Sequence, residues 1–174
     1  MLKVRRFVAL AVACAAVVTA PALAAPSGPF AHACTSGTEA AAMLVHVTGF
    51  KQRTGTIRVQ LYGGDPERYF DKHTYLRRID LPVPGEGPLD VCVPAPTPGT
   101  YAVSVRHDID GTGKTGREDG GGMSGNPEMS LFDLMFKRKP APAKVAVQVG
   151  HGVRVVPVVL NYVEGLSFRP ITSR

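Results

Sequence analysis

The sequence predicts an all-β protein, an antiparallel two-sheet sandwich of the immunoglobulin-like or transthyretin-like kind, with about seven strands and one short helix. One observation is a series of short runs in which every second residue is apolar, which is typical of strands that bury one face. A second is that the 19 glycines and 15 prolines lie largely between these runs, as turns do in sandwiches and barrels.

The first two predicted strands show the clearest alternation. They are Ala42–Phe50 (AMLVHVTGF) and Thr56–Tyr62 (TIRVQLY). In the second, Ile57, Val59 and Leu61 share the inward face, while the residues between them face water. The intervening KQRTG has the length of a hairpin turn.

Three more patterns follow along the chain. Tyr75–Leu81 and Leu89–Val93 are predicted as short strands on either side of a proline- and glycine-rich break. In PTPGTYAVSVRH, a Pro-Gly turn precedes a strand in which Tyr101, Val103 and Val105 alternate with small or polar residues. His107 continues the inward phase of that strand.

Gly111–Asn126 is predicted to be a loop, because it contains seven glycines and almost no apolar side chain. A loop of about 20 residues is long for a compact domain, and such loops are usually functional, ligand-ordered or disordered. Ser130–Phe136 (SLFDLMF) is predicted to be a short helix that Ser130 and Asp133 cap. Leu131, Leu134 and Met135 would share its inner face.

Two strands are predicted near the C-terminus. In Lys144–Val149 the valines lie in phase, and Val153–Tyr162 is apolar on both faces, which indicates a central strand. Pro157 within it requires a bulge or an edge position. Residues 41–163 thus form the predicted sandwich domain, with an extended lead-in over 25–40 and a loose C-terminal tail over 164–174.

The N-terminus reads as a signal peptide spanning residues 1–24. Lys3, Arg5 and Arg6 form a basic start, Phe7–Val18 is apolar, and Ala22–Ala24 supplies the small-x-small cleavage pattern. The alternatives are a retained anchor helix, although the apolar run falls short of the roughly 20 residues of a membrane span, and a lipoprotein acylated at Cys14.

Cleavage after Ala24 predicts a periplasmic or secreted protein with no transmembrane segment. It removes three positive charges, so the formal net charge falls from +6 to +3. That mild charge argues against nucleic acid as a partner, which requires a dense basic patch.

Export would leave two cysteines, Cys34 and Cys92. In an oxidising compartment they are expected to form a disulfide, closing a loop of roughly 60 residues and contributing roughly 4 kcal/mol. A metal or catalytic role for Cys92 is the alternative, but its apolar neighbours offer no base to form a thiolate.

Several motifs together resemble one known family. They are PGTYAVSVRHDIDGTGK, the glycine-rich segment after it, GMSGNP, LFDLMF and VPVVLNY. Over Leu44–Tyr162 the chain resembles a family of exported bacterial proteins called domain of unknown function 2141. The resemblance implies a β-sandwich.

The segment that follows His107 fits the spacing of a calcium-binding loop. A hard cation needs several converging oxygens, which alternate residues of a tight loop can supply while glycines allow the sharp turns. Few carboxylates would give weak affinity, roughly 10⁻⁴–10⁻³ M. The predicted ligands are Asp108, Asp110, Thr112, the Lys114 carbonyl and Asp119, with Gly111 and Gly113 in the turns.

Two other interpretations stay open. The aspartates could bond backbone N–H groups and stabilise the turn without an ion, with a buried His107 holding the loop in place. Alternatively, His107 could be the centre of an enzyme or a transition-metal site together with His46, His73 or His151. The chain has no tryptophan, which argues against an aromatic glycan-binding platform.

The function these observations predict is non-catalytic. We expect an accessory or binding module of the cell envelope, whose partner is an envelope protein or a small ligand. Calcium is the only cofactor predicted, and the His107-centred enzyme or metal-handling protein is the alternative.

Overall fold

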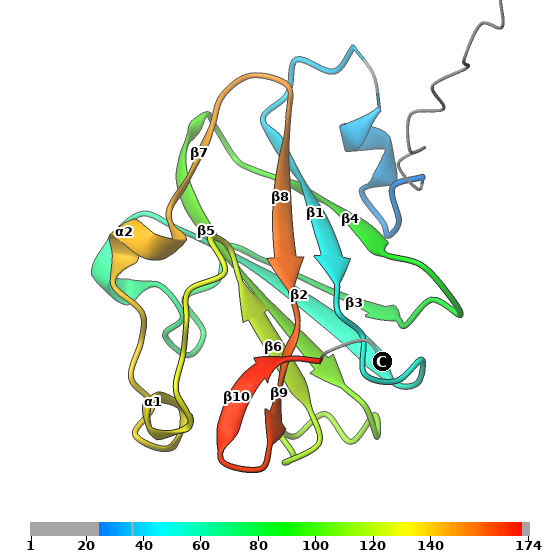
Figure 1. The fold of residues 1–174 in the computed structure, drawn as a ribbon. Coiled ribbons are helices and arrows are strands. Elements are labelled where there is room, and N and C mark those ends of the chain that lie inside the picture. Colours follow the sequence, from blue (N-terminus) through cyan, green and yellow to red (C-terminus); the bar gives the residue numbers. More distant parts are fainter. Residues whose placement is uncertain (1–24, 36, 172–174) are drawn as a thin grey trace, which may run out of the picture.

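The computed structural model describes residues 25–35 and 37–171. The predicted signal peptide, residues 1–24, lies outside the described residues. Ten strands in two sheets, two short α-helices and two 3-10 helices make up this part of the chain (Figure 1). The prediction of an all-β two-sheet sandwich is confirmed. The strands are β1 (Ala42–Thr48), β2 (Thr56–Gly63), β3 (Arg77–Pro82), β4 (Leu89–Pro94), β5 (Gly99–Asp108), β6 (Gly120–Met123), β7 (Val147–Val149), β8 (Val153–Val159), β9 (Asn161–Glu164) and β10 (Ser167–Pro170).

The smaller sheet has three strands in the order β4-β1-β8. β1 pairs with β4 antiparallel but with β8 in parallel. The expected hairpin across KQRTG is wrong, because β1 and β2 belong to different sheets. The expectation that β8 would be central is wrong, because β8 is an edge strand and its apolar Val153 and Val155 are exposed. Pro157 therefore lies on a sheet edge, where its missing N–H costs no ladder bond.

The larger sheet has seven strands. Six follow the order β10-β9-β6-β5-β2-β3, and β7 pairs with the start of β5. The antiparallel register of β2 and β5 places Val59 opposite Val105 and Ile57 opposite His107. The predicted inward faces of these two strands are therefore confirmed, since all four of these side chains are buried.

Three segments differ from the predictions. The predicted loop Gly111–Asn126 contains strand β6, and the tail predicted to be loose contains β10. The predicted strand Val153–Tyr162 is two strands, β8 and β9, which belong to different sheets. A second short helix, α2 (Pro142–Val145), precedes β7 where only a strand was expected.

Helix α1 (Leu131–Met135) forms where it was predicted. Ser130 and Asp133 make the reciprocal capping box. One detail of the prediction is wrong: Met135 is 67% exposed instead of lying on the inner face with Leu131 and Leu134. A helix of five residues is too short for a wide buried stripe.

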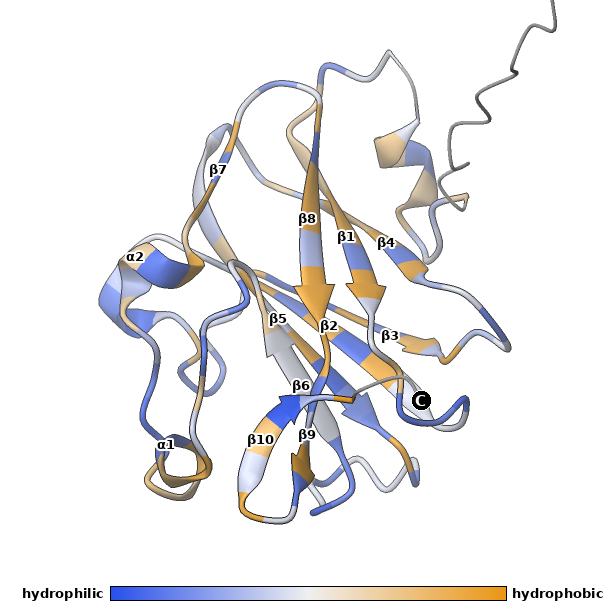
Figure 2. Ribbon diagram, viewed as in Figure 1, coloured by the Kyte–Doolittle hydropathy of each residue, from blue (hydrophilic) through white to orange (hydrophobic). Residues whose placement is uncertain are grey.

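The core lies between the two sheets. Hydrophobic colouring follows β1 and β8 in Figure 2, and alternate residues of the strands supply the buried side chains. The largest of those that are fully buried include Tyr162, Met43, Ile57, Leu61, Leu160 and His107. Throughout residues 25–35 and 37–171, no helix is long and apolar enough to cross a membrane.

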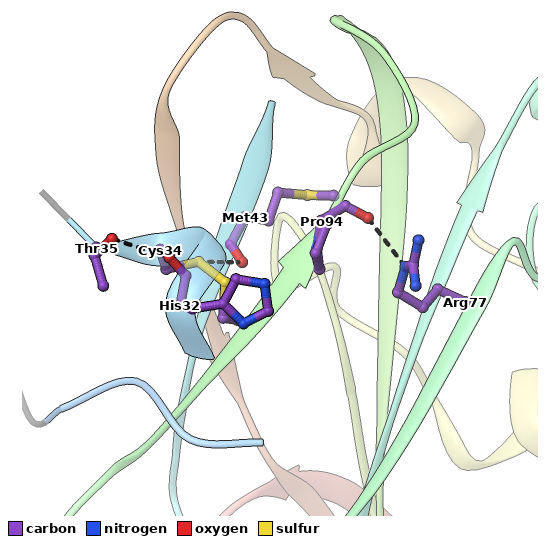
Figure 3. The surroundings of a disulfide bond; sticks show 7 residues. His32, Cys34, Thr35, Met43, Arg77 and Pro94 are labelled. Carbon is purple, nitrogen blue, oxygen red and sulfur yellow. Dashed lines mark hydrogen bonds between the residues drawn. A yellow bond between two sulfur atoms is a disulfide. The ribbon is translucent and has the colours of Figure 1, made fainter. Parts of the chain in front are cut away.

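The predicted disulfide is present and fixes the lead-in to the smaller sheet. Cys34, at the end of the 3-10 helix η1 (Ala31–Cys34), is bonded to Cys92 of β4, with 5.7 Å between the two Cα atoms (Figure 3). Upstream, the Ser27 N–H donates to the Asp90 carbonyl (2.7 Å), and the Cys92 N–H donates to the Ser27 carbonyl (3.4 Å). The lead-in, expected to be extended, is thus partly helical and covers the outer edge of β4.

Candidate functional site

The candidate site begins at the end of β5. Successive residues of a strand point to opposite faces, so Arg106 and Asp108 lie on the outer side of the larger sheet, and His107 lies between the sheets. Asp108 is the last residue of β5 and pairs with Thr56 of β2. A rigid strand end therefore positions the first residue of the acidic loop, the name used here for residues 108–119.

His107 is enclosed and uses both ring nitrogens. Its Nε2 lies 2.9 Å from the Thr54 carbonyl, and its Nδ1 lies 2.7 Å from the Tyr162 hydroxyl. A carbonyl can only accept, so Nε2 carries the proton and Nδ1 accepts from Tyr162. Burial lowers the pKa of His107 in spite of the Thr54 carbonyl and the nearby Asp119 and Asp108. The imidazole is therefore neutral at neutral pH, and neither nitrogen is open to a metal ion or a substrate.

The Tyr162 hydroxyl connects His107 to the loop before β2. It accepts from the Lys51 backbone N–H at 3.2 Å while donating to His107. Burial raises the pKa of Tyr162 to about 12. This chain of hydrogen bonds holds the base of the acidic loop against the sandwich.

Three carboxylates converge in the acidic loop. One oxygen from each of Asp108, Asp110 and Asp119 lies within 4.8 Å of the other two. Ligand oxygens sit about 2.3–2.6 Å from a Ca²⁺ ion, so two ligands of one ion lie at most about 5 Å apart. The separations are thus compatible with a shared calcium ion.

The same carboxylates also hold the loop's backbone. Asp108 Oδ2 accepts from the Gly113 N–H (2.8 Å) and from the Arg106 guanidinium (2.6 Å). Asp119 accepts through its two oxygens from the N–H groups of Ile109 (3.1 Å) and Gly116 (2.8 Å). These contacts are the ones that the turn-stabilising interpretation requires.

One oxygen of the cluster is not accounted for by these bonds. Asp108 is 2% exposed, and its Oδ1 is buried without a hydrogen-bond partner in the described part of the chain. Leaving a buried charged oxygen unpaired is costly. The geometry therefore offers an acceptor that a cation could satisfy.

The other predicted ligands are arranged differently. Thr112 Oγ1 lies 3.4 Å from both the carbonyl and the N–H of Lys114, so these two residues bond to each other. Gly111 and Gly113 have φ values of 67° and 76°, a backbone conformation that favours glycine. Hydrogen bonding to Thr112 lowers the pKa of Asp110, which keeps that carboxyl ionised.

His46 and His151 have partners elsewhere in the protein. His46 Nδ1 lies 2.6 Å from Asp90 Oδ1 on the smaller sheet, and His151 contacts the Glu39 carbonyl. Over residues 25–35 and 37–171, Asp108, Asp110 and Asp119 form the only group of three or more histidine, cysteine or acidic side chains with metal-ligand spacing.

A feature that sequence reasoning missed is a cavity of about 440 Å³ on the outer face of the larger sheet, called the groove below. Polar residues of β2 and β5 line it, and so do three aromatic rings and part of the acidic loop. The only trace of the groove in the sequence is the set of polar residues that alternate with the apolar ones in β2 and β5. Such residues predict a face in contact with water and do not by themselves indicate a cavity. The residues that line it include Gln60, Ser104, Arg106, Tyr62, Phe70, Phe168, Gly116 and Asp119.

The comparisons with known proteins place the chain in a family. A family model described as an uncharacterized protein conserved in bacteria, domain of unknown function 2141, matches residues 45–156. No curated protein and no solved structure gives a significant match. The matched stretch includes β5, the acidic loop and α1, which carry most of the motifs of the resemblance, but it ends at Val156, where the VPVVLNY motif begins. The chain therefore belongs to the bacterial family called domain of unknown function 2141.

Proposed function

We propose that this protein is a non-catalytic binding module exported to the bacterial envelope, in which a Ca²⁺ ion held by the acidic loop orders one wall of the groove. The observation that carries the proposal is the Asp108 carboxylate. This carboxylate is buried, and its Oδ1 has no partner among the described residues. The Asp110 and Asp119 carboxylates converge on the same Asp108 carboxylate.

Charge balance supports a divalent cation. The three carboxylates carry three negative charges, and within the described chain the one ion pair that reaches them is the 2.6 Å contact of Arg106 with Asp108. Two negative charges remain, which is the charge that one Ca²⁺ offsets. Carboxylate and carbonyl oxygens are also the ligands that Ca²⁺ prefers. With three protein carboxylates, water would complete the coordination, and we expect a dissociation constant of roughly 10⁻⁴–10⁻³ M.

The position of the loop connects the ion to the groove. Gly116 and Asp119 line the groove, and Asp119 also belongs to the carboxylate cluster. An ion that fixes Asp119 would therefore fix the adjacent wall. The groove combines aromatic rings with polar side chains, as small-molecule sites do, so its ligand would be a small molecule with a partly apolar surface.

Two observations favour export and a non-catalytic role. The Cys34–Cys92 disulfide is typical of proteins in oxidising compartments such as the periplasm. His107, the strongest candidate for acid–base chemistry, is buried and uses both nitrogens within the protein. Its contacts fit a role in holding the loop.

Thermal unfolding of the purified protein with and without Ca²⁺ tests the site. At 10 mM Ca²⁺, about 10–100 times the expected dissociation constant, the ion should stabilise the fold by about 1.4–2.7 kcal/mol. That corresponds to a rise in Tm of roughly 4–10 °C for a chain of this size. Asp110→Asn should abolish most of the rise, because it removes one of the three carboxylates of the cluster. Asp110 is exposed, so the substitution leaves the core untouched.

Asp65→Asn provides the matched control. Asp65 is also exposed and also accepts a backbone N–H two residues ahead (Glu67, 3.0 Å), as Asp110 does from Thr112 (3.1 Å). It lies outside the carboxylate cluster, so the Asp65→Asn variant should keep the full response. Equal Tm values with Ca²⁺ and with a chelator, or an undiminished response in Asp110→Asn, would reduce the loop to a turn held by its own aspartates.

A further inference from the structure

Four large apolar side chains project into solvent from the α1 segment and from the neighbouring β9–β10 turn. Phe132, Met135 and Phe136 of the α1 segment are 66%, 67% and 64% exposed, and Leu166 of the β9–β10 turn is 89% exposed. We call these four residues the apolar tip. Figure 1 shows α1 and the β9–β10 hairpin at the same end of the molecule, and one cavity is lined by both Phe132 and Leu166.

The exposed apolar face of α1 belongs to a well-defined helix. The capping box of Ser130 and Asp133 fixes the start of α1. Its half-buried Leu131 and Leu134 face the body of the protein, where Leu134 lines the groove. The opposite face carries Phe132 and Phe136, whose rings stack at 6.5 Å with an interplanar angle of 6°. A surface helix ordinarily has a polar outer face, so an outer face of two phenylalanines and a methionine requires another explanation.

Basic residues follow the apolar tip directly. Lys137, Arg138 and Lys139 are consecutive and exposed. Lys139 pairs with Asp71 at 2.9 Å, and the Arg138 guanidinium lies 5.8 Å from the centre of the Phe136 ring. Apolar side chains beside Lys and Arg are the combination by which short interfacial segments bind anionic membrane surfaces.

We propose that the apolar tip docks the protein on the surface of an anionic lipid bilayer, with Phe132, Phe136 and Leu166 in the interfacial region and the basic run at the headgroups. A lipid surface fits better than a protein partner. The four side chains expose roughly 500 Å² together, less than the about 800 Å² per partner that a stable protein interface buries. The proposal does not depend on calcium binding by the acidic loop.

The absence of tryptophan from the sequence gives a direct test. A Phe132→Trp variant carries a single indole at the apolar tip, and Val155→Trp carries one at an exposed apolar position on the smaller sheet. Each is titrated with vesicles of phosphatidylglycerol and, separately, of phosphatidylcholine. We expect the emission of Phe132→Trp to shift to the blue with phosphatidylglycerol vesicles, and the emission of Val155→Trp to stay unchanged.

Charge reversal tests the electrostatic part. In the Phe132→Trp background, the double change Lys137→Glu and Arg138→Glu should raise the lipid concentration at half-maximal shift at least about tenfold. Arg154→Glu, an exposed position on β8, should leave it within about twofold. Because these residues are exposed, far-UV circular dichroism should be unchanged in every variant.

Three results would overturn the proposal. The first is no shift with either kind of vesicle. The second is an equal shift in Val155→Trp, which indicates non-specific adsorption of the whole protein. The third is a shift in buffer alone that grows with protein concentration, which assigns the apolar tip to contact between copies of the chain.

Discussion

The two halves of the larger sheet are built in different ways. On one side, β3, β2 and β5 have six, eight and ten residues, and their alternate apolar side chains fill the core. On the other, β6, β9 and β10 have four residues each. Only one large side chain from these three strands, Tyr162, is fully buried. The packing of the first half depends on many buried side chains. The packing of the second half depends on the Tyr162 ring and on the glycines of β6 that let this ring approach the strand.

The glycines of β6 show this dependence directly. A Cβ on Gly120 would lie 2.6 Å from Tyr162 Cζ, and one on Gly122 would lie 2.7 Å from the Val159 carbonyl oxygen. A Cβ on Gly121, which faces the groove, would have its nearest neighbours at 3.8 Å. Gly120 and Gly122 therefore have no room for a side chain, whereas Gly121 does.

The largest expected effect comes from Gly120→Ala. The added methyl group would collide with a Tyr162 ring that is itself enclosed and hydrogen-bonded, so we expect the free energy of unfolding to fall by about 3 kcal/mol. Urea denaturation measures the change. Gly121→Ala is the matched control and should alter stability by less than about 0.5 kcal/mol. Similar losses in both variants would remove the distinction between the two faces of β6.

A smaller loss is expected when the Tyr162 hydroxyl is removed. Tyr162→Phe leaves His107 Nδ1 and the Lys51 N–H without the partner they share, which should cost about 2 kcal/mol. Tyr101→Phe makes the same change in β5, where the hydroxyl donates to the Thr97 carbonyl at 2.6 Å. That variant should lose about 1 kcal/mol. A greater loss at Tyr101 would contradict the central position assigned to Tyr162.

The smallest expected effect is a dependence on pH. Burial keeps the pKa of His107 below its ordinary value of 6.5, so the unfolded chain binds this proton more readily than the folded one. The contribution of neutral His107 to the free energy of unfolding is fully present above pH 6.5. It is lost as the pH falls below that value, by at most about 1.4 kcal/mol per pH unit. Denaturation curves between pH 5 and 7.5 should therefore show a flatter profile for His107→Gln than for the unchanged protein. Parallel profiles would mean that His107 is not the group responsible.

The same contrast explains which strands the sequence could predict. Thr56–Tyr62 is recognisable because Ile57, Val59 and Leu61 alternate with polar residues. β6 is not, because its three glycines carry no side chain to show a period. The crowding at Gly120 and Gly122 comes from Tyr162, Val158 and Val159, which lie far along the chain. β8 and β9 merge in the sequence because the chain stays apolar as it passes from one sheet to the other through the buried Leu160.

For the candidate site, the spacing of residues along the loop predicted the acidic ligands, but it could not predict the partners that come from distant parts of the chain. Asp108, Asp110 and Asp119 were selected by loop spacing, and His107 was placed inside by the phase of β5. The partners of His107 could not be predicted, since Tyr162 and Thr54 lie 55 and 53 residues away along the chain. The groove and the apolar tip depend on how separate loops meet at the outer face of the sheet, which no short pattern encodes.

The lead-in that the disulfide holds against β4 has a consequence for association between copies of the chain. An uncovered strand edge can recruit a strand from another molecule. In the smaller sheet, Ser27 occupies the free edge of β4, and on the far side Pro157 of β8 lacks a donor. Reduction of Cys34–Cys92 would release the first of these barriers while leaving the second in place. Oligomers or fibrils that formed under reducing conditions would then be expected to grow from β4.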